Sequence, residues 1–316
     1  MKEQKTDLLI IGAGPGGLGA ALYAKRSGLD FLIVEKNMAG GQIINTDLIE
    51  NYPGFMDNIS GFELAQKLSE HCKSFGIEIM EYFPIKSIDE VQHNSGGKSY
   101  RFRCSGEDSV IFAGALIIAT GARPDRLGAK GEAGLMGKGI SFCATCDGAL
   151  YRDMEVAVVG GGDTAVEEAL FLTKLAKKVY IIHRRDELRA YDRLQHKAKE
   201  NKKIEILWSS VVEEFVGSEK LEGVIIKNVK DSTVKHIDIA AVFEYVGLQP
   251  NSEMVRHLVN TDEKGFIITD MIMKTSREGI FAIGDVRTTP FRQVVTAVAD
   301  GAIAAMYVDK YFLEQG

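Results

Sequence analysis

The sequence predicts an α/β protein with two Rossmann-like, three-layer nucleotide-binding domains. Two glycine-rich loops, at residues 12–17 and 160–165, each follow a short apolar run and precede a helix-like segment. The second copy begins about half a chain after the first, which indicates two domains of related design. The length of 316 residues agrees with this, because single hydrophobic cores usually stop growing near that size.

The first unit opens with a continuous apolar run at residues 7–11, typical of a parallel strand buried on both faces. The glycine loop follows, and residues 18–27 continue as a helix rich in small side chains. Residues 31–34 are the next apolar run, which ends at Glu35. This order of elements predicts a βαβ unit.

The second unit repeats this plan. Residues 156–159 are apolar, the loop follows, and residues 166–176 have a helical pattern. The next apolar run, 179–182, ends at His183. We therefore expect a second βαβ unit.

Two further apolar runs, at residues 115–121 and 279–285, end at a glycine or a glycine–aspartate pair. Each predicts a strand whose carboxyl end meets a ligand, as in open α/β sheets. Residues 294–312 predict a long alanine-rich helix. Residues 208–245 alternate between apolar and polar, which predicts a hairpin or meander attached to the second unit.

The composition narrows the classes of function. A net charge of −6 disfavours nucleic acid as a partner, because binding to phosphates needs a basic face. No apolar run is long enough to span a membrane. The N-terminal residues lack a signal-peptide pattern, so we expect no membrane partner and a cytoplasmic location.

The first glycine loop has the spacing of a dinucleotide-binding fingerprint. Gly12 permits a tight turn, Gly14 lets the backbone approach a pyrophosphate, and Gly17 allows helix and strand to pack closely. The amino end of the following helix then faces the phosphates. Glu35 lies 18 residues after Gly17, where a carboxylate can accept a hydrogen bond from a ribose 2′-OH.

The second loop differs from the first in one informative position. Counting 18 residues from Ala165 leads to His183 instead of a carboxylate. Three arginines follow it: Arg184, Arg185 and Arg189. A carboxylate would repel a 2′-phosphate, whereas arginines hold it with charge-assisted hydrogen bonds. The first loop therefore suits a dinucleotide with a free 2′-OH, and the second suits NADPH.

Cys143 and Cys146 form a Cys-x-x-Cys just ahead of the second loop. In a cytosolic chain this spacing indicates a redox-active or metal-binding pair. Zinc would need two more ligands at suitable spacing, and a chance spacing is the other alternative. Asp147 could shuttle a proton or simply cap a turn. Cys72 and Cys104 are expected to be ordinary small semi-buried residues.

Together these residues resemble the bacterial-type (low molecular weight) thioredoxin reductases, an FAD- and NADPH-dependent family of pyridine nucleotide-disulfide oxidoreductases. The resemblance covers nearly the whole chain. It rests on residues 12–17, 40–42, 50–54, 120–121, 143–148, 160–168, 183–190, 284–285, 292–293 and 300–301.

The resemblance implies an FAD-binding domain in two segments, with the second domain inserted between them. The first FAD segment is expected at residues 1–113 and the second at residues 246–316. The NADPH-binding domain, with its redox Cys-x-x-Cys, is expected at residues 114–245.

The resemblance also implies which residues touch each cofactor. Those expected at FAD are Gly12, Gly14, Pro15, Gly16, Gly17, Glu35, Lys36, Gly41, Gln42, Asn51, Thr120, Gly121, Gly284, Asp285, Arg292, Gln293 and Val294. Those expected at NADPH are Gly162, Asp163, Thr164, Ala165, His183, Arg184, Arg185 and Arg189.

The implied reaction passes hydride from NADPH to the flavin and then electrons to the Cys143–Cys146 disulfide. Cys146 is expected nearest the flavin, Cys143 attacks the disulfide of oxidised thioredoxin or a similar redoxin, and Asp147 is the acid/base. In this family the NADPH domain rotates against the FAD domain, and homodimers are usual.

Some positions depart from the family pattern and leave the acceptor open. Ala149 and Leu150 stand where aromatic residues are common, and Lys138 stands where arginine is common. Alternatives are the flavoprotein of a peroxiredoxin system, the reductase of another redoxin, and a small-molecule dithiol oxidase. An NADPH sensor without turnover is a further alternative, which the intact Cys-x-x-Cys disfavours.

Overall fold

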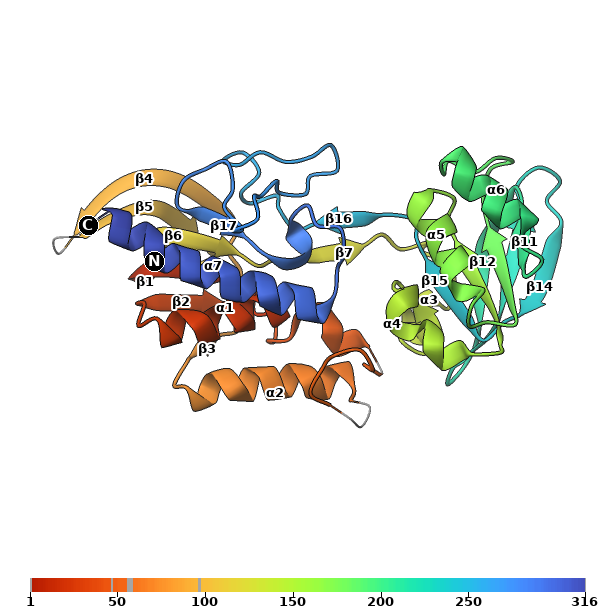
Figure 1. Cartoon of the computed structure of the whole chain (residues 1–316), viewed down its shortest axis with the longest axis horizontal. Coiled ribbons are helices and arrows are strands. Elements are labelled where there is room, and N and C mark those ends of the chain that lie inside the picture. Colours follow the sequence, from red (N-terminus) through yellow and green to blue (C-terminus); the bar gives the residue numbers. More distant parts are fainter. Residues whose placement is uncertain (1, 47, 56–58, 96–97, 316) are drawn as a thin grey trace. The chain divides into compact units, whose positions relative to one another are not determined.

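The structure is a computed structural model that describes residues 2–46, 48–55, 59–95 and 98–315 (Figure 1). It divides into two compact units. The first comprises the chain up to residue 46, residues 52–123 and the chain from residue 249 onward. The second comprises residues 124–248, with the short stretch 47–51 grouped with it. The α/β fold class is confirmed.

The first unit is built on one mixed sheet. Its strands are ordered β3 (Ile79–Met80), β2 (Phe31–Val34), β1 (Lys2–Ile11), β6 (Ser109–Ile118), β5 (Lys98–Ser105) and β4 (Ser87–Ser95), and β17 (Ile280–Ala282) also pairs with β6. Strands β3, β2, β1, β6 and β17 pair in parallel, whereas β5 pairs antiparallel with both β6 and β4. Because β6 is one continuous strand of this sheet, the unit ends at residue 123, after the expected boundary at 113.

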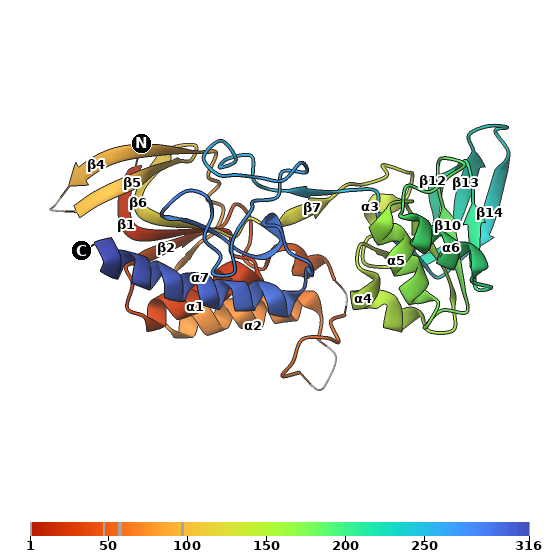
Figure 2. The ribbon, with the colours of Figure 1, turned by 45° about the horizontal axis from the view of Figure 1, so that its top comes forward.

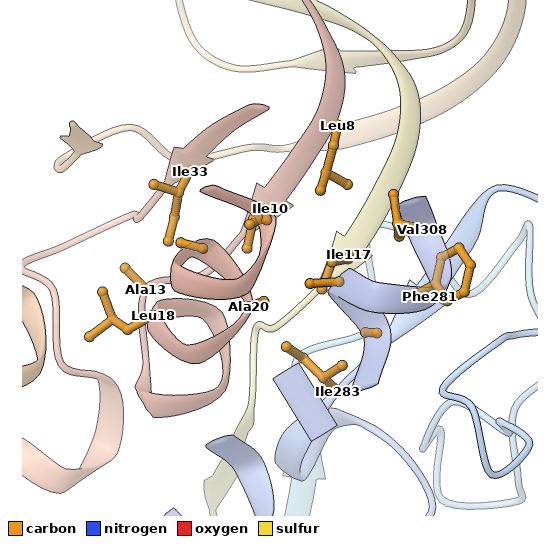
Figure 3. Packing of buried hydrophobic residues seen from close by; sticks show 14 of the residues in the cluster. Leu8, Ile10, Ala13, Leu18, Ala20, Ile33, Ile117, Phe281, Ile283 and Val308 are labelled. Carbon is orange, nitrogen blue, oxygen red and sulfur yellow. The ribbon is translucent and has the colours of Figure 1, made fainter. Parts of the chain in front are cut away.

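The helices of the first unit, as far as its residues are described, are α1 (Pro15–Arg26), α2 (Gly61–Ser74) and α7 (Val294–Gln315). Leu8, Ile10 and Ile117 pack with α1 and α7 in one buried cluster (Figure 3). The neighbouring residues Leu9 and Leu116 face a second cluster on the other side of the sheet. Burial on both faces explains the uninterrupted apolar runs of these strands.

Helices α1 and α7 pack closely because they carry small residues. A Cβ on Gly301 would lie 2.3 Å from the Gly16 carbonyl oxygen, and one on Gly19 would lie 3.1 Å from the Val298 carbonyl oxygen. The close approach of the two backbones accounts for the small residues at these contacts.

The second unit contains a parallel sheet ordered β11 (Ile204–Leu207), β10 (Lys178–Ile182), β9 (Glu155–Val159), β15 (Ala241–Glu244) and β8 (Ile140–Ser141). An antiparallel sheet of β12 (Ser210–Gly217), β13 (Leu221–Asn228) and β14 (Val234–Asp238) is the expected meander. Its helices are α3 (Glu132–Leu135), α4 (Ala144–Asp147), α5 (Asp163–Leu172) and α6 (Asp192–Glu200). The meander packs on one face of the parallel sheet, and α5 and α6 pack on the other (Figure 2).

Short elements complete both units. Strands β7 (Ala122–Pro124) and β16 (Leu248–Pro250) pair where the chain passes between the units. Single 3₁₀ turns are η1 (Gly41–Asn45), η2 (Gly148–Tyr151) and η3 (Gly284–Val286). Among the described residues, no helix combines the length and apolar character needed to cross a membrane.

Candidate functional site

The first glycine loop leaves no room for side chains at two of its positions. Gly12 has a φ of +108°, and a Cβ there would lie 2.4 Å from the Ala119 carbonyl oxygen. A Cβ on Gly17 would lie 1.9 Å from the Gly12 carbonyl oxygen. At Gly14, by contrast, the nearest atom to a Cβ is 3.8 Å away. The loop is therefore tight against the protein and open where a pyrophosphate would approach.

Glu35 is held beside this loop. It is 8% exposed, and its carboxylate accepts the Ala13 N–H at 2.8 Å and the Asn37 N–H at 3.0 Å. A carboxylate has lone pairs left for hydroxyl donors after two such bonds. The remaining acceptor sites of this carboxylate thus fit the hydroxyls of a dinucleotide ribose, and Lys36, the next residue, is exposed.

The turn that carries Gly41 and Gln42 lies against the same loop. The Gly40 N–H donates to the Ala13 carbonyl at 2.8 Å, and a Cβ on Gly41 would lie 3.0 Å from the Gly14 Cα. The expected residues of both segments therefore meet at the amino end of α1, where Pro15 and Gly16 begin the helix. Asn51 is exposed.

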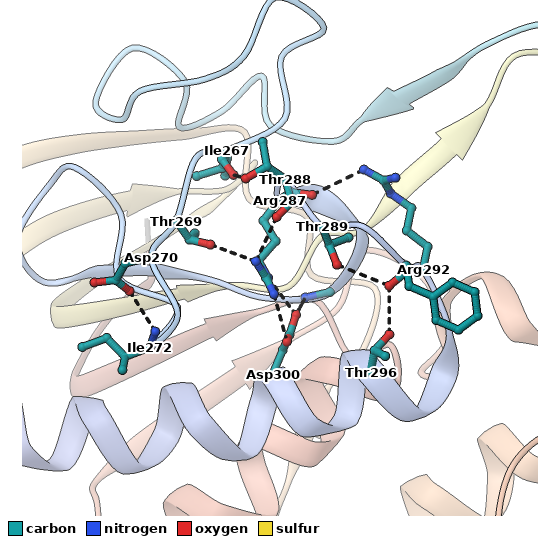
Figure 4. A network of polar contacts seen from close by, with 12 residues as sticks. Ile267, Thr269, Asp270, Ile272, Arg287, Thr288, Thr289, Arg292, Thr296 and Asp300 are labelled. Atoms are coloured by element: carbon teal, nitrogen blue, oxygen red, sulfur yellow. Dashed lines mark hydrogen bonds and ion pairs between the residues drawn. The ribbon is translucent and has the colours of Figure 1, made fainter. Parts of the chain in front are cut away.

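The turn with Gly284 and Asp285 is fixed by Arg287, which sequence reasoning missed, and by Asp300, which entered there only as part of the family resemblance. Arg287 forms a two-pronged ion pair with Asp300 on α7 (Figure 4). Asp300 is only 8% exposed, and it also accepts the Gly284 N–H at 3.0 Å. No local pattern announces a pair that joins a turn to a helix 13 residues away.

Asp285 and Arg292 have opposite charges in a partly buried setting. Burial raises the pKa of Asp285, while Arg292 opposes that rise. Burial also lowers the pKa of Arg292, whose guanidinium lies 4.3 Å from the centre of the Phe266 ring. Gln293 and Val294 follow directly, and the Gln293 N–H donates to the Thr296 hydroxyl at 3.1 Å.

Thr120 and Gly121 lie at the carboxyl end of β6. The Thr120 hydroxyl donates to the Asn251 carbonyl at 2.6 Å, and the Asn251 side-chain amide donates back to the Thr120 carbonyl at 2.8 Å. The Asn251 N–H donates to the Gly121 carbonyl. The hydroxyl proton of Thr120 is therefore used within the protein, which leaves its oxygen as an acceptor.

The second glycine loop is covered by the segment that carries the arginines. The Arg189 N–H donates to the Gly161 carbonyl at 2.7 Å. A Cβ on Gly161 would lie 2.3 Å from the His183 ring, whereas one on Gly162 would meet nothing within 4 Å. The open space in front of α5 fits phosphates at a helix amino end. Thr164 and Ala165 continue that first turn, and Asp163 accepts the Tyr191 N–H at 2.8 Å.

His183 and the arginines have different environments. His183 is 5% exposed, and burial, with smaller effects of Arg189 and Arg185, lowers its pKa. Arg184, Arg185 and Arg189 are exposed. The structure therefore places a buried imidazole under the loop and three exposed guanidinium groups in the segment around it, and these guanidinium groups are donors suited to a phosphate monoester.

Cys143 and Cys146 form a disulfide with a Cα–Cα distance of 5.3 Å. Cys143 precedes α4, and its sulfur accepts the Cys146 N–H at 3.2 Å. The carboxylate of Asp147, at the end of α4, accepts the hydroxyl of Ser141 at 2.5 Å. Cys72 and Cys104 are fully buried, whereas semi-buried positions were expected, and burial raises their thiol pKa values to about 11 and about 12. The disulfide is thus the redox-competent pair.

Comparisons with known proteins agree with this geometry. Residues 6–301 match a family model described as pyridine nucleotide-disulphide oxidoreductase. The chain is 45% identical over 314 residues to a thioredoxin reductase of Listeria monocytogenes, a match that covers 99% of this chain and 96% of the relative. It is 43% identical over 316 residues to a thioredoxin reductase of Bacillus subtilis, covering 99% and 97% of the two chains. The crystal structure of thioredoxin reductase from Streptococcus pyogenes is similar with a TM-score of 0.91 at 48% identity, covering 98% of this chain and 99% of that one.

Proposed function

The chain belongs to the pyridine nucleotide-disulphide oxidoreductase family, and on that premise we propose that it is a thioredoxin reductase that works with FAD and NADPH. The observation that carries this proposal is the Cys143–Cys146 disulfide, followed by Asp147, in the unit that also holds the arginine-flanked glycine loop. The overall reaction converts NADPH, one proton and a disulfide into NADP⁺ and two thiols.

The first unit is assigned to FAD and the second to NADPH. When bound, these groups supply two-electron chemistry, with NADPH as the hydride donor. Glu35 would accept hydrogen bonds from the FAD ribose, and the loop at 12–17 would face the pyrophosphate. Arg184, Arg185 and Arg189 would bind the 2′-phosphate that distinguishes NADPH from NADH.

The dithiol and Asp147 carry the exchange with the partner. In the reduced enzyme, Cys143 Sγ attacks one sulfur of the partner disulfide and forms a mixed disulfide, while the other partner sulfur leaves as a thiolate. Cys146 Sγ then attacks Cys143 Sγ and releases the second partner sulfur. The two protons of the enzyme dithiol end on the two product thiols. Asp147 is assigned the role of accepting and returning one of them.

Contacts around the sulfurs support Cys143 as the attacking group. The Cys146 N–H donates to Cys143 Sγ, and a backbone donor stabilises a thiolate there.

The substrate is a thioredoxin or thioredoxin-like redoxin. We also assign a homodimer and a cytoplasmic location, in line with the family and with the absence of a membrane-spanning helix among the described residues.

The acceptor is tested by anaerobic and aerobic assays of NADPH oxidation by the purified flavoprotein. We expect rapid oxidation with added oxidised thioredoxin and slow oxidation with oxygen alone. Rapid turnover with oxygen and a small dithiol, but not with thioredoxin, would identify an oxidase instead. Bound flavin without turnover on any acceptor would identify a sensor.

A further inference from the structure

The hydroxyl of Ser141 lies between Asp147 and the backbone of Cys143. It donates to Asp147 Oδ2 at 2.5 Å and accepts the Cys143 N–H at 3.0 Å. A second acceptor, the Cys143 carbonyl oxygen, lies 3.4 Å from the same hydroxyl. Ser141 is 7% exposed, so water does not substitute freely for these contacts.

We propose that Ser141 is a positioning residue for the acid/base Asp147, holding its carboxyl group in both protonation states. This inference rests on the proposed function and deepens it. Ser141 acts through Asp147, because its hydroxyl contacts the carboxylate and the Cys143 backbone.

The hydrogen-bonding capacity of a hydroxyl explains how one residue serves both states. A serine has one proton to donate and two lone pairs that accept. With Asp147 ionised, the Ser141 proton points to the carboxylate and one lone pair accepts the Cys143 N–H. With Asp147 protonated, the carboxylic O–H donates to Ser141 Oγ, and the serine proton turns to the Cys143 carbonyl. The carboxyl group therefore gains and loses its proton without losing its anchor.

The fold makes Ser141 a rigid anchor. It ends strand β8, and Ser141 is in register with Phe243 of β15 in the parallel sheet. The hydroxyl ties the acid at the end of α4 to this sheet. A proton-transfer group held by an element of the scaffold keeps its geometry through the catalytic cycle.

Other titratable groups around this centre are Cys143 and Cys146 themselves, Tyr245, which directly follows β15, and Glu168 of α5. Burial raises the pKa of Tyr245, and nearby Glu168 and Asp147 raise it further. The Tyr245 hydroxyl accepts the Ala144 N–H at 2.7 Å. A Ser141 variant keeps all four side chains but removes the contacts of the hydroxyl with Asp147 and with the Cys143 backbone. Comparison with the same change in an Asp147→Asn background therefore assigns a shifted pH profile to the Ser141–Asp147 contact.

The test compares Ser141→Ala and Ser141→Gly with Ser141→Thr, which keeps a hydroxyl. We expect both truncations to lower kcat for thioredoxin reduction about tenfold and to leave KM for thioredoxin unchanged. Without a donor to the carboxylate, the acidic limb of the rate profile moves up by about one pH unit. Ser141→Thr restores the wild-type profile. In an Asp147→Asn background, Ser141→Ala has no further effect, because the two residues act as one unit.

Controls separate folding, function and inference. Ser252→Ala removes a hydroxyl that is similarly buried and donates to the Gly265 carbonyl at 2.7 Å, and it should leave the profile in place. The absorbance of bound flavin and the NADPH-dependent reduction of ferricyanide show whether each variant is folded, because neither measurement uses the dithiol. The pH dependence of iodoacetamide alkylation of the reduced dithiol measures the effect of Ser141 without using thioredoxin. If the wild-type protein failed to reduce thioredoxin, that result would refute the proposed function, and the alkylation measurement would still test the role of Ser141.

The inference is overturned if both truncations keep the wild-type profiles, or if Ser141→Ala and Asp147→Asn have additive effects. Loss of FAD from both truncations, with Ser141→Thr intact, also overturns it, because the hydroxyl would then serve folding alone.

Discussion

Arg287 forms a bidentate ion pair with Asp300, in which Nε lies 2.8 Å from Oδ2 and Nη2 lies 3.1 Å from Oδ1. The same Oδ2 accepts the Gly284 N–H at 3.0 Å. Both side chains are largely buried, at 13% and 11% exposure. This pair therefore fixes the Gly284–Val286 turn on helix α7, next to residues assigned to FAD (Figure 4).

Removing the acid from this pair should destabilise the protein and weaken its hold on FAD. Asp300→Ala leaves a buried guanidinium without the carboxylate that balances its charge, which costs about 3 kcal/mol. Thermal unfolding and the flavin retained after gel filtration measure the two effects. Lys230→Ala is the control, since its ion pair with Asp186 is exposed to water and should contribute little to stability. Equal effects of the two substitutions would contradict this role of the pair.

Gly17→Ala should abolish FAD binding. Its Cβ would lie 1.9 Å from the Gly12 carbonyl oxygen, so α1 must move away from the loop that we assign to the pyrophosphate. Gly134→Ala is a matched control, because a Cβ there meets nothing within 4 Å. The flavin absorbance of the purified variants decides the matter. A yellow Gly17→Ala protein with wild-type affinity would refute the assignment of this loop.

Replacing Arg184 and Arg185 by glutamine should narrow the preference for NADPH over NADH by roughly tenfold to a hundredfold. The 2′-phosphate loses two charge-assisted partners, whereas NADH loses nothing comparable. The ratio of kcat/KM for the two nucleotides is the measurement. Arg256→Gln with Lys264→Gln removes the same charge at exposed positions elsewhere and should leave the ratio intact. An unchanged ratio in the first variant would place selectivity at other residues.

Glu244 should make stability fall as pH rises. It is 2% exposed, and burial, with the nearby Glu132, raises its pKa from 4.5 to about 8. Between these values the folded protein holds a proton that the unfolded chain has released. The free energy of unfolding therefore decreases by about 1.4 kcal/mol per pH unit through this window.

Urea unfolding of wild type and Glu244→Gln across this pH range tests that slope. The variant should lose most of the decline and be more stable than wild type near pH 8. Glu222→Gln, at an exposed position, should unfold like wild type. The same slope in wild type and Glu244→Gln would show that another group titrates.

Features that depend on local sequence could be predicted. The two glycine loops, the fold class and the meander follow from apolar runs and glycine spacing, and the structure contains them. The predicted ends of helices and strands are less accurate than the predicted order of the elements. Helix α1 begins at Pro15 instead of residue 18, because proline fits the first turn while the glycines that follow hide the helical pattern. Strand β1 extends back to Lys2 because its polar first half pairs with β6.

Features that depend on tertiary contact could not be predicted. The β4–β5 hairpin is largely polar in sequence and is defined by its pairing with β6. The Arg287–Asp300 pair joins a turn to a helix, and the contact of Ser141 with Asp147 crosses the dithiol turn. A glutamate is expected at the surface from its residue type alone, whereas the fold buries Glu244.

Anaerobic titration with NADPH tests the central claim, that electrons leave through the Cys143–Cys146 disulfide. We predict that the wild-type flavoprotein takes up two more electrons per chain than Cys146→Ser, because the disulfide is a second two-electron acceptor beside the flavin. Cys72→Ala should match wild type. Equal uptake by wild type and Cys146→Ser, with thioredoxin reduction preserved in the variant, would contradict the account.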